Sequence, residues 1–381
     1  MALITYLTRI QFDFGAIKLL EAELQLLGMR RPLIVTDKGI VAAGIWDRVK
    51  ANLPGNMPIS MYDQTPENPT EAAMREALAV YREQKCDGII AVGGGSSMDL
   101  AKAVGLMATH PGPSLLPYAT VEGGAPKITP AVAPIVAIPT TSGTGSEVSR
   151  GGVIIMDNGR KLAIGSPNLI PKLALCDPEL TLGLPSHLTA GTGMDAIAHC
   201  AETFMSAAIN PPAEAIALDG LEKAWRHLER AVKDGQDREA RWNMMMASMQ
   251  GAMCFQKGLG AVHSLSHPTG GLKGLRLHHG TLNALYMPGV VRFNGPALSS
   301  GKIEKMAAIM GTKPSAEALA DAISGMNERI GIPKGLKAMG VTEDRFEAIA
   351  DGALIDHCHM TTPRQPTKAQ YLELIEGAYG A

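Results

Sequence analysis

The chain carries acidic and imidazole side chains at spacings that suit metal binding. Asp195 and His199 are four residues apart in GMDAIAHCAE, and His263 and His267 are four apart in AVHSLSHPTGG. On a helix, residues four apart leave the same face one turn apart, so each pair can present two donors to one ion. These spacings predict a metal site that draws on both segments.

A third segment, LRLHHG, supplies His278 and His279. The assembled set has one carboxylate, several imidazoles and no thiolate, which suits Fe(II), Zn(II), Mn(II) or Co(II). The alternative is a group of hydrogen-bonded core histidines. Two pairs with helical spacing and a His-His-Gly turn in one short region favour the metal site.

Length and composition narrow the functional classes. A chain of 381 residues predicts two domains, while a net charge of −2 and 4% aromatic residues argue against a nucleic-acid-binding surface. Apolar runs are too short to cross a bilayer, and MALITYLTRIQFDFG lacks the features of a signal peptide, so we expect a cytoplasmic protein. The cysteines are far apart without a CxxC motif, which predicts reduced thiols.

The first half of the sequence alternates between helical and extended patterns. Helices are expected at 16–27 and 39–51, strands at 31–37 and 58–63, and a further helix begins after Thr70 as N-cap. Such alternation predicts a parallel sheet, and so an α/β domain.

A glycine-rich turn follows the next strand. The apolar run 88–92 leads into GGGSS and then into a helix that carries Asp99 and Lys102. Glycines let a backbone approach a pyrophosphate, and a helix N-terminus offers free N–H groups. Because the motif is not GxGxxG, a simple tight turn is the alternative.

Two further features stand at predicted strand ends. PTTSGTGSE places hydroxyl groups after the apolar run VAPIVAI, where they can bind phosphate or ribose, or form a plain polar loop. Asp37 ends the first predicted strand and suits a ribose 2′-hydroxyl, which favours NAD over NADP; an ordinary turn aspartate is the alternative. Together they predict a dinucleotide site at the carboxyl edge of the sheet.

The second half has the periodicity of helices. We predict an all-α domain over 185–381 after an α/β domain over 1–184, with LTLGLPSHLTAGTG as a loop that ends near Ala190. The predicted helices are 194–207, 212–232, 238–255, 301–310, 316–330, 343–351 and 368–377.

Five motifs together, GGGS, PTTSGTGSE, GMDAIAH, HSLSHPTGG and HHG, resemble the iron-containing (group III) alcohol dehydrogenase family over essentially the whole chain. DFGA, IVTDKG and LHHGTLNA are similar to segments of its 4-hydroxybutyrate dehydrogenases. The resemblance implies a dehydroquinate synthase-like architecture, with a Rossmann-like parallel sheet, a helical domain, a site in the cleft between them, and a homodimer.

The resemblance also assigns roles to individual residues. It implies the metal ligands Asp195, His199, His263 and His279, and places His267 beside nicotinamide and substrate as the proton carrier. The segment GGLKGLRLHH is longer than in many members, which leaves His278 as the alternative to His279. The implied cofactor contacts are Asp37, Gly94, Gly95, Ser96, Asp99, Thr140, Thr141 and Thr144.

The implied activity is a metal- and NAD-dependent alcohol dehydrogenase that uses Fe(II), with Zn(II) as the alternative, on a small-molecule substrate. The expected pair is 4-hydroxybutyrate and succinic semialdehyde, whose carboxylate needs a cation; we favour Arg276 over Arg150 and Lys273. Phe255 and Cys358 complete the predicted substrate residues. The alternatives are a lyase or synthase of the same fold, a broader dehydrogenase of the glycerol or 1,3-propanediol type, and a nucleotide-binding regulatory protein.

Overall fold

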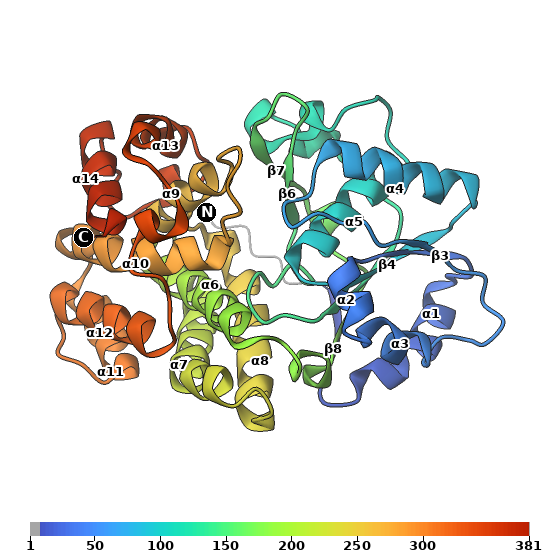
Figure 1. Ribbon diagram of the computed structural model, residues 1–381, viewed down its shortest axis with the longest axis horizontal. Coiled ribbons are helices and arrows are strands. Elements are labelled where there is room, and N and C mark those ends of the chain that lie inside the picture. The colour runs from blue at the N-terminus through green and yellow to red at the C-terminus, as the bar shows by residue number, and fades with distance from the viewer. Residues whose placement is uncertain (1–7, 381) are drawn as a thin grey trace. The chain divides into compact units, whose positions relative to one another are not determined.

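The computed structural model describes residues 8–380, which fall into two compact units (Figure 1). The sheet unit comprises the described chain up to Thr141 together with Gly145–Gly183, and the helical unit comprises Ser142–Thr144 and the chain from Leu184 onward. The prediction that the N-terminal segment is no signal peptide rests partly on residues 1–7, which lie outside the described range. None of the described helices is both long and apolar enough to cross a membrane.

The sheet unit is built on a six-stranded sheet in which all neighbouring strands are parallel, so the predicted parallel sheet is confirmed. The chain adds β3 on the outer side of β2, and it adds β5 and then β8 on the far side of β4. The direction in which strands are added therefore reverses between the neighbouring strands β2 and β4. The strand order is β1 (Arg9–Phe12), β8 (Leu173–Cys176), β5 (Ile135–Pro139), β4 (Gly88–Gly93), β2 (Pro32–Val35) and β3 (Ser60–Tyr62).

Helices cover both faces of this sheet. Its central strands are buried along their whole length, as expected for strands enclosed on both sides. Alternate residues point to opposite faces: Leu33 and Ile89 pack with α4 (Glu71–Glu83) and α5 (Gly95–Met107), while Ile34 and Ile90 pack with α1 (Leu20–Leu27) and α3 (Ile45–Lys50).

Several local predictions for the sheet unit were wrong or incomplete. The helix expected at 39–51 is two helices, α2 (Lys38–Ala42) and α3, because Gly44 adopts a left-handed φ of 71° between them. The strands β1 and β8 were not predicted, nor was the antiparallel hairpin of β6 (Gly151–Ile155) and β7 (Lys161–Gly165). Thr70 does cap α4, since its hydroxyl accepts a hydrogen bond from the Ala73 N–H at 3.1 Å.

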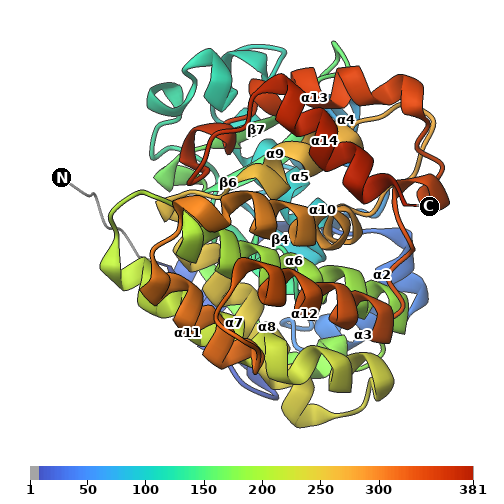
Figure 2. The same cartoon turned by 90° about the vertical axis from the view of Figure 1, so that its left-hand side faces the viewer.

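The helical unit packs around one continuous apolar core. The long helix α6 contacts α7, α8 and α10, and these helices are labelled together with α12 in Figure 2. Its helices are α6 (Ser186–Met205), α7 (Pro211–Lys233), α8 (Arg238–Cys254), α9 (Ala261–Gly270), α10 (His279–Asn294), α11 (Ser300–Met310), α12 (Ala316–Arg329), α13 (Phe346–Leu354) and α14 (Lys368–Tyr379).

The loop predicted to end near Ala190 is wrong, because α6 already begins at Ser186. Gly191 and Gly193 lie in this part of α6, and glycine has a low intrinsic helix propensity. Here the glycines permit close packing, since a Cβ atom on Gly193 would lie 2.2 Å from Cδ1 of Leu228. No ranges were predicted for α9 and α10, each of which contains a proline, although the spacing of His263 and His267 did indicate a helical turn within α9.

Candidate functional site

The predicted metal-binding side chains gather inside the helical unit. The Nε2 atom of His199 lies 3.6 Å from Oδ1 of Asp195, and the Nε2 atoms of His263 and His279 each lie 3.7 Å from the same oxygen. These separations are too long for hydrogen bonds. Two bonds of about 2.1 Å that meet at a tetrahedral angle hold their donor atoms about 3.4 Å apart, so the spacing fits ligands around one ion.

Two helix backbones bring these residues together. A Cβ atom on Gly280 would lie 2.1 Å from the carbonyl oxygen of Gly191, so α10 begins in direct backbone contact with α6. This contact sets His279 opposite Asp195. His278 instead caps α10, because its Nδ1 accepts a hydrogen bond from the Thr281 N–H at 3.3 Å.

A buried carboxylate that the sequence analysis missed holds one of the imidazoles. Oε2 of Glu202 lies 2.6 Å from Nδ1 of His263, and Oε1 accepts a hydrogen bond from the Val262 N–H at 2.8 Å. Because Nδ1 of His263 donates to this carboxylate, Nε2 is the nitrogen that can give its lone pair to a metal ion. Glu202 is seven residues from Asp195 on α6, a helical spacing that could have revealed it.

The electrostatics of the cluster favour a bound cation. Burial alone would raise the pKa of Asp195, but the surrounding imidazoles outweigh it and hold this pKa well below its usual value. Burial lowers the pKa of His199 to about 4, which keeps it a neutral donor. Asn283 also points its Nδ2 group at Oδ1 of Asp195, 2.7 Å away. The donor set and its anionic centre therefore fit a divalent metal ion.

His267 lies beside this cluster and has its own carboxylate partner. Its ring stacks on that of His279 with 5.4 Å between centroids, and its Nδ1 lies 2.8 Å from Oδ2 of Asp356. Burial would raise the pKa of Asp356, but His267 and His357 hold it well below the ordinary value, so the carboxylate accepts and His267 Nδ1 donates. Nε2 of His267 is then the nitrogen that can exchange a proton.

In the sheet unit, the glycine-rich turn lies where β4 passes into α5. Gly93 has a φ of 149°, and a Cβ atom on it would lie 2.6 Å from Oγ of Ser97. Gly94 is the N-cap of α5, and a Cβ atom there would lie 3.3 Å from Oγ1 of Thr141. Side chains at these glycines would fill the space next to the helix N-terminus, the position where α/β sheets bind a pyrophosphate.

Several hydroxyl groups at this edge have no hydrogen-bond partner among the described residues. Thr36, Thr65, Ser97 and Thr140 follow β2, β3, β4 and β5 respectively, and the hydroxyl oxygen of each is buried and unpaired. Buried polar groups normally have partners, so four such groups at the carboxyl edge of one sheet need an explanation. They fit a polar ligand such as a dinucleotide.

Other predicted cofactor contacts have partners within the protein. Oδ1 of Asp37 caps α2 by accepting from the Ile40 N–H at 3.0 Å, which leaves Oδ2 for a ribose hydroxyl. The Ser96 hydroxyl donates to the carbonyl oxygen of Glu67. Both carboxylate oxygens of Asp99 accept hydrogen bonds, from Ser146 Oγ at 2.7 Å and from the Val153 N–H at 2.9 Å. Asp99 therefore ties α5 to β6, which a sequence motif alone does not reveal.

The remaining predicted residues differ in their surroundings. Gly95 is the first residue of α5, and Thr144 belongs to the three-residue segment of the helical unit. Phe255 packs edge-on against His199, with 5.2 Å between ring centroids. Cys358 is buried beside His357, whereas Arg150, Lys273 and Arg276 are exposed at the surface.

Comparisons with known proteins cover almost the entire chain. A family model described as iron-containing alcohol dehydrogenase matches residues 8–178, and one for the C-terminal part of the Fe-containing alcohol dehydrogenase family matches residues 189–379. The chain is 57% identical over 381 residues to a 4-hydroxybutyrate dehydrogenase from Cupriavidus necator, with 99% of each chain covered.

Solved structures agree with this result. A 1,3-propanediol oxidoreductase is similar with a TM-score of 0.92 at 35% identity, covering 99% of this chain and 100% of that one. A sulfoacetaldehyde reductase from Bifidobacterium kashiwanohense in complex with NAD+ is similar with a TM-score of 0.87 at 27% identity, covering 99% of each chain.

Proposed function

The chain belongs to the iron-containing alcohol dehydrogenase family, and from this premise we propose that it interconverts 4-hydroxybutyrate and succinic semialdehyde. It is a metal- and NAD-dependent alcohol oxidoreductase with the dehydroquinate synthase-like fold. The observation that carries the substrate assignment is the 57% identity to a 4-hydroxybutyrate dehydrogenase along the full length of both chains.

In this proposal Fe(II) is held by Asp195, His199, His263 and His279. The Nε2 atoms of the three histidines each lie 3.6–3.7 Å from Oδ1 of Asp195, a separation that fits donor atoms around one ion. When bound, the metal supplies Lewis acidity toward the substrate oxygen, and the nicotinamide supplies or accepts the hydride. Glu202 fixes the His263 ring so that Nε2 faces the other donors.

The proposed proton carrier is His267. The Asp356 carboxylate holds the proton on Nδ1, so Nε2 can take a proton from the alcohol during oxidation and return it during reduction. His267 stacks on His279, so it lies next to the proposed metal ligands. In this proposal the substrate oxygen lies beside the same ligands. Phe255, which packs against His199, is proposed to line the same space with apolar surface.

For the cofactor we propose that the turn at Gly93 and Gly94 accommodates the pyrophosphate at the N-terminus of α5. Thr140 and Thr141 offer hydroxyl groups beside it, and Oδ2 of Asp37 accepts from the adenosine ribose. A carboxylate at that position disfavours a 2′-phosphate, so NAD is the proposed cofactor.

A substrate panel tests the proposal. Metal-free protein would be reconstituted anaerobically with Fe(II) or Zn(II), and the oxidation of NADH followed with succinic semialdehyde, butanal and 3-hydroxypropanal. We expect the highest kcat/KM for succinic semialdehyde with Fe(II). A higher value for 3-hydroxypropanal would favour the 1,3-propanediol type, and no oxidation of NADH with any aldehyde would contradict the proposal.

Two further properties belong to the proposal. We expect a homodimer in solution, to be measured by light scattering, and a cytoplasmic location, to be measured by cell fractionation.

A lyase or synthase of the same fold would consume substrate without net change in NADH, so the substrate panel also separates that alternative from a dehydrogenase.

A further inference from the structure

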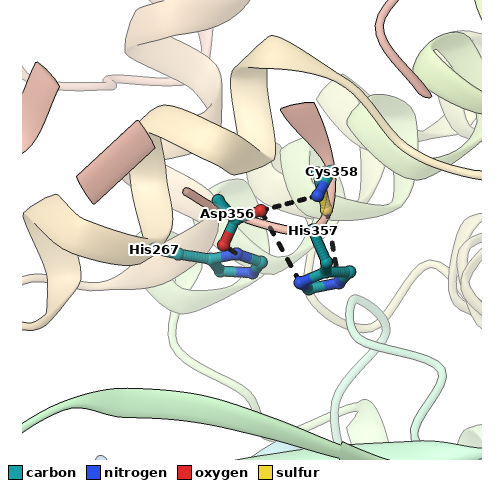
Figure 3. A group of neighbouring side chains, drawn as sticks. All are labelled: His267, Asp356, His357 and Cys358. Atoms are coloured by element: carbon teal, nitrogen blue, oxygen red, sulfur yellow. Dashed lines mark hydrogen bonds and ion pairs between the residues drawn. The ribbon is translucent and has the colours of Figure 1, made fainter. Parts of the chain in front are cut away.

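A second group of potential metal ligands lies in the helical unit. One donor atom each from His267, Asp356, His357 and Cys358 falls within 4.8 Å of the other three (Figure 3). Among the described residues only this group and the one around Asp195 meet that criterion. His267 comes from α9, and the other three are consecutive residues in the segment that follows α13.

The contacts within this group centre on one carboxylate. Oδ2 of Asp356 accepts from His267 Nδ1 at 2.8 Å, and Oδ1 accepts from the Cys358 N–H at 2.8 Å. Nδ1 of His357 lies 3.6 Å from Oδ1, and its Nε2 lies 3.4 Å from Sγ of Cys358. The two imidazole rings stack with 5.6 Å between centroids (Figure 3).

A hydrogen-bonded network is the simpler interpretation of the pair His267 and Asp356, because that pair has a role in the proposed proton transfer. It does not account for a buried thiol directed at an imidazole. A thiolate, imidazoles and a carboxylate form the ligand set of borderline and thiophilic divalent ions such as Zn(II). The set around Asp195 contains no sulfur.

The group also has a route for entry and the freedom to close. The side chains of His267 and Asp356 are 12% and 13% exposed and Cys358 is buried, whereas the His357 side chain is 43% exposed. Donor atoms up to 4.8 Å apart must approach to about 3.4–3.6 Å around a tetrahedral ion. Rotation of the His357 ring can bring its nitrogen closer, and the contact of 2.8 Å between His267 Nδ1 and Asp356 Oδ2 lengthens when both bind the ion.

We propose that His267, Asp356, His357 and Cys358 form a second, inhibitory metal site that binds Zn(II) or a similar thiophilic divalent ion. Binding replaces the thiol proton of Cys358, which leaves to solvent, with a sulfur–metal bond. The proton on Nδ1 of His267 moves to Nε2 as Nδ1 binds the ion, and nothing is oxidised or reduced. The inhibitory effect rests on the proposed function, because the ion takes Nδ1 of His267 away from Asp356 and fixes the proton carrier. The binding itself does not depend on that function.

Cobalt spectroscopy tests the binding. The full chain, freed of metal, would be titrated with Co(II) without oxygen, and we expect two equivalents to bind and a thiolate-to-Co(II) charge-transfer band to appear in the near ultraviolet. Cys358→Ser should remove the band and one equivalent. Cys254→Ser, which alters another buried thiol, is the matched control and should keep both. No band in the unmodified chain, or the same band in Cys358→Ser, would overturn the site.

An inhibition assay tests the consequence. Enzyme loaded with Fe(II) should lose NADH-dependent activity as Zn(II) is added, and His357→Ala should need about tenfold more Zn(II) or more for the same loss. His187→Ala, at an exposed histidine at the start of α6, should respond like the unmodified enzyme. Equal sensitivity of His357→Ala would mean that Zn(II) acts elsewhere, for example by displacing iron. An inactive but well-folded enzyme that still gives the cobalt band would contradict the proposed function and not the site.

Discussion

Oε2 of Glu202 lies 2.6 Å from Nδ1 of His263, and both side chains are buried in the helical unit. The same carboxylate accepts from the Val262 N–H, so it fixes the first turn of α9 as well as the imidazole. One residue therefore determines both the position and the tautomer of a proposed metal ligand.

Glu202→Gln should weaken metal binding by about 10 to 100-fold, because an amide orients the His263 ring less firmly and carries no charge. The measurement is competition for Co(II) or Fe(II) with a chelator of known affinity. Glu239→Gln, at a surface residue paired with Arg230, is the control and should bind metal normally. An unchanged dissociation constant for Glu202→Gln would contradict this role.

Asp356→Asn should reduce kcat by about 100-fold or more while the iron bound at the Asp195 site and the KM for NADH stay unchanged. The amide can present N–H to Nδ1 of His267, which favours the tautomer with the proton on Nε2 and so removes the acceptor. Asp356→Glu should restore part of the rate. A parallel loss of iron from the Asp195 site in Asp356→Asn would indicate a structural role instead.

Asp37→Ser should shift the cofactor preference toward NADPH by about 1–2 kcal/mol, or about 5 to 30-fold. Serine keeps a cap for α2, so the local fold survives while the negative charge is removed. Initial rates with NADH and NADPH at saturating aldehyde give the ratio. The same ratio before and after the substitution would remove Asp37 from the ribose site.

Arg276→Ala should raise the KM for succinic semialdehyde much more than that for butanal, because only the first carries a carboxylate. Arg276 is exposed in the segment between α9 and α10, as is Lys273, so Lys273→Ala is the matched control. If Arg276→Ala affects both aldehydes equally, the cation lies elsewhere and Arg150→Ala is the next variant.

Glu147→Gln should make the protein more stable at pH 8 and change little near pH 4.5. Burial raises the pKa of Glu147 from 4.5 to about 7, so the folded state binds more protons than the unfolded state between these values. Stability contributed by the protonated form is therefore lost as pH rises through that window, at a cost of about 1–3 kcal/mol above pH 7. Thermal unfolding at the two pH values measures it, and an equal change at both would contradict the prediction.

The sequence predicted the parallel sheet and the family because apolar runs and motifs are local signals. It placed the start of α6 at 194 in place of 186 and gave no ranges for α9 and α10; these three helices carry the proposed metal ligands. Glycines inside α6 and prolines inside α9 and α10 lower helix propensity, and tertiary packing overrides that preference.

Partners distant along the chain could not be predicted at all. Asp356 is 89 residues from His267 and reaches it only because α13 packs against α9. Asp99 shows a second limit: its motif suggested a cofactor contact and did not reveal that its two oxygens accept hydrogen bonds from Ser146 and Val153. A motif gives the type of a residue, and only the fold gives its partner.

The direct contact between Gly191 and Gly280 has an evolutionary consequence. Because the backbones of α6 and α10 already touch there, the separation of the helix axes at the proposed metal site is at its lower limit. Any larger residue at Gly280 would push His279 away from Asp195. We therefore expect enzymes that diverge on this pair of helices to acquire new metals or substrates through the side chains around the contact, with glycine retained at position 280.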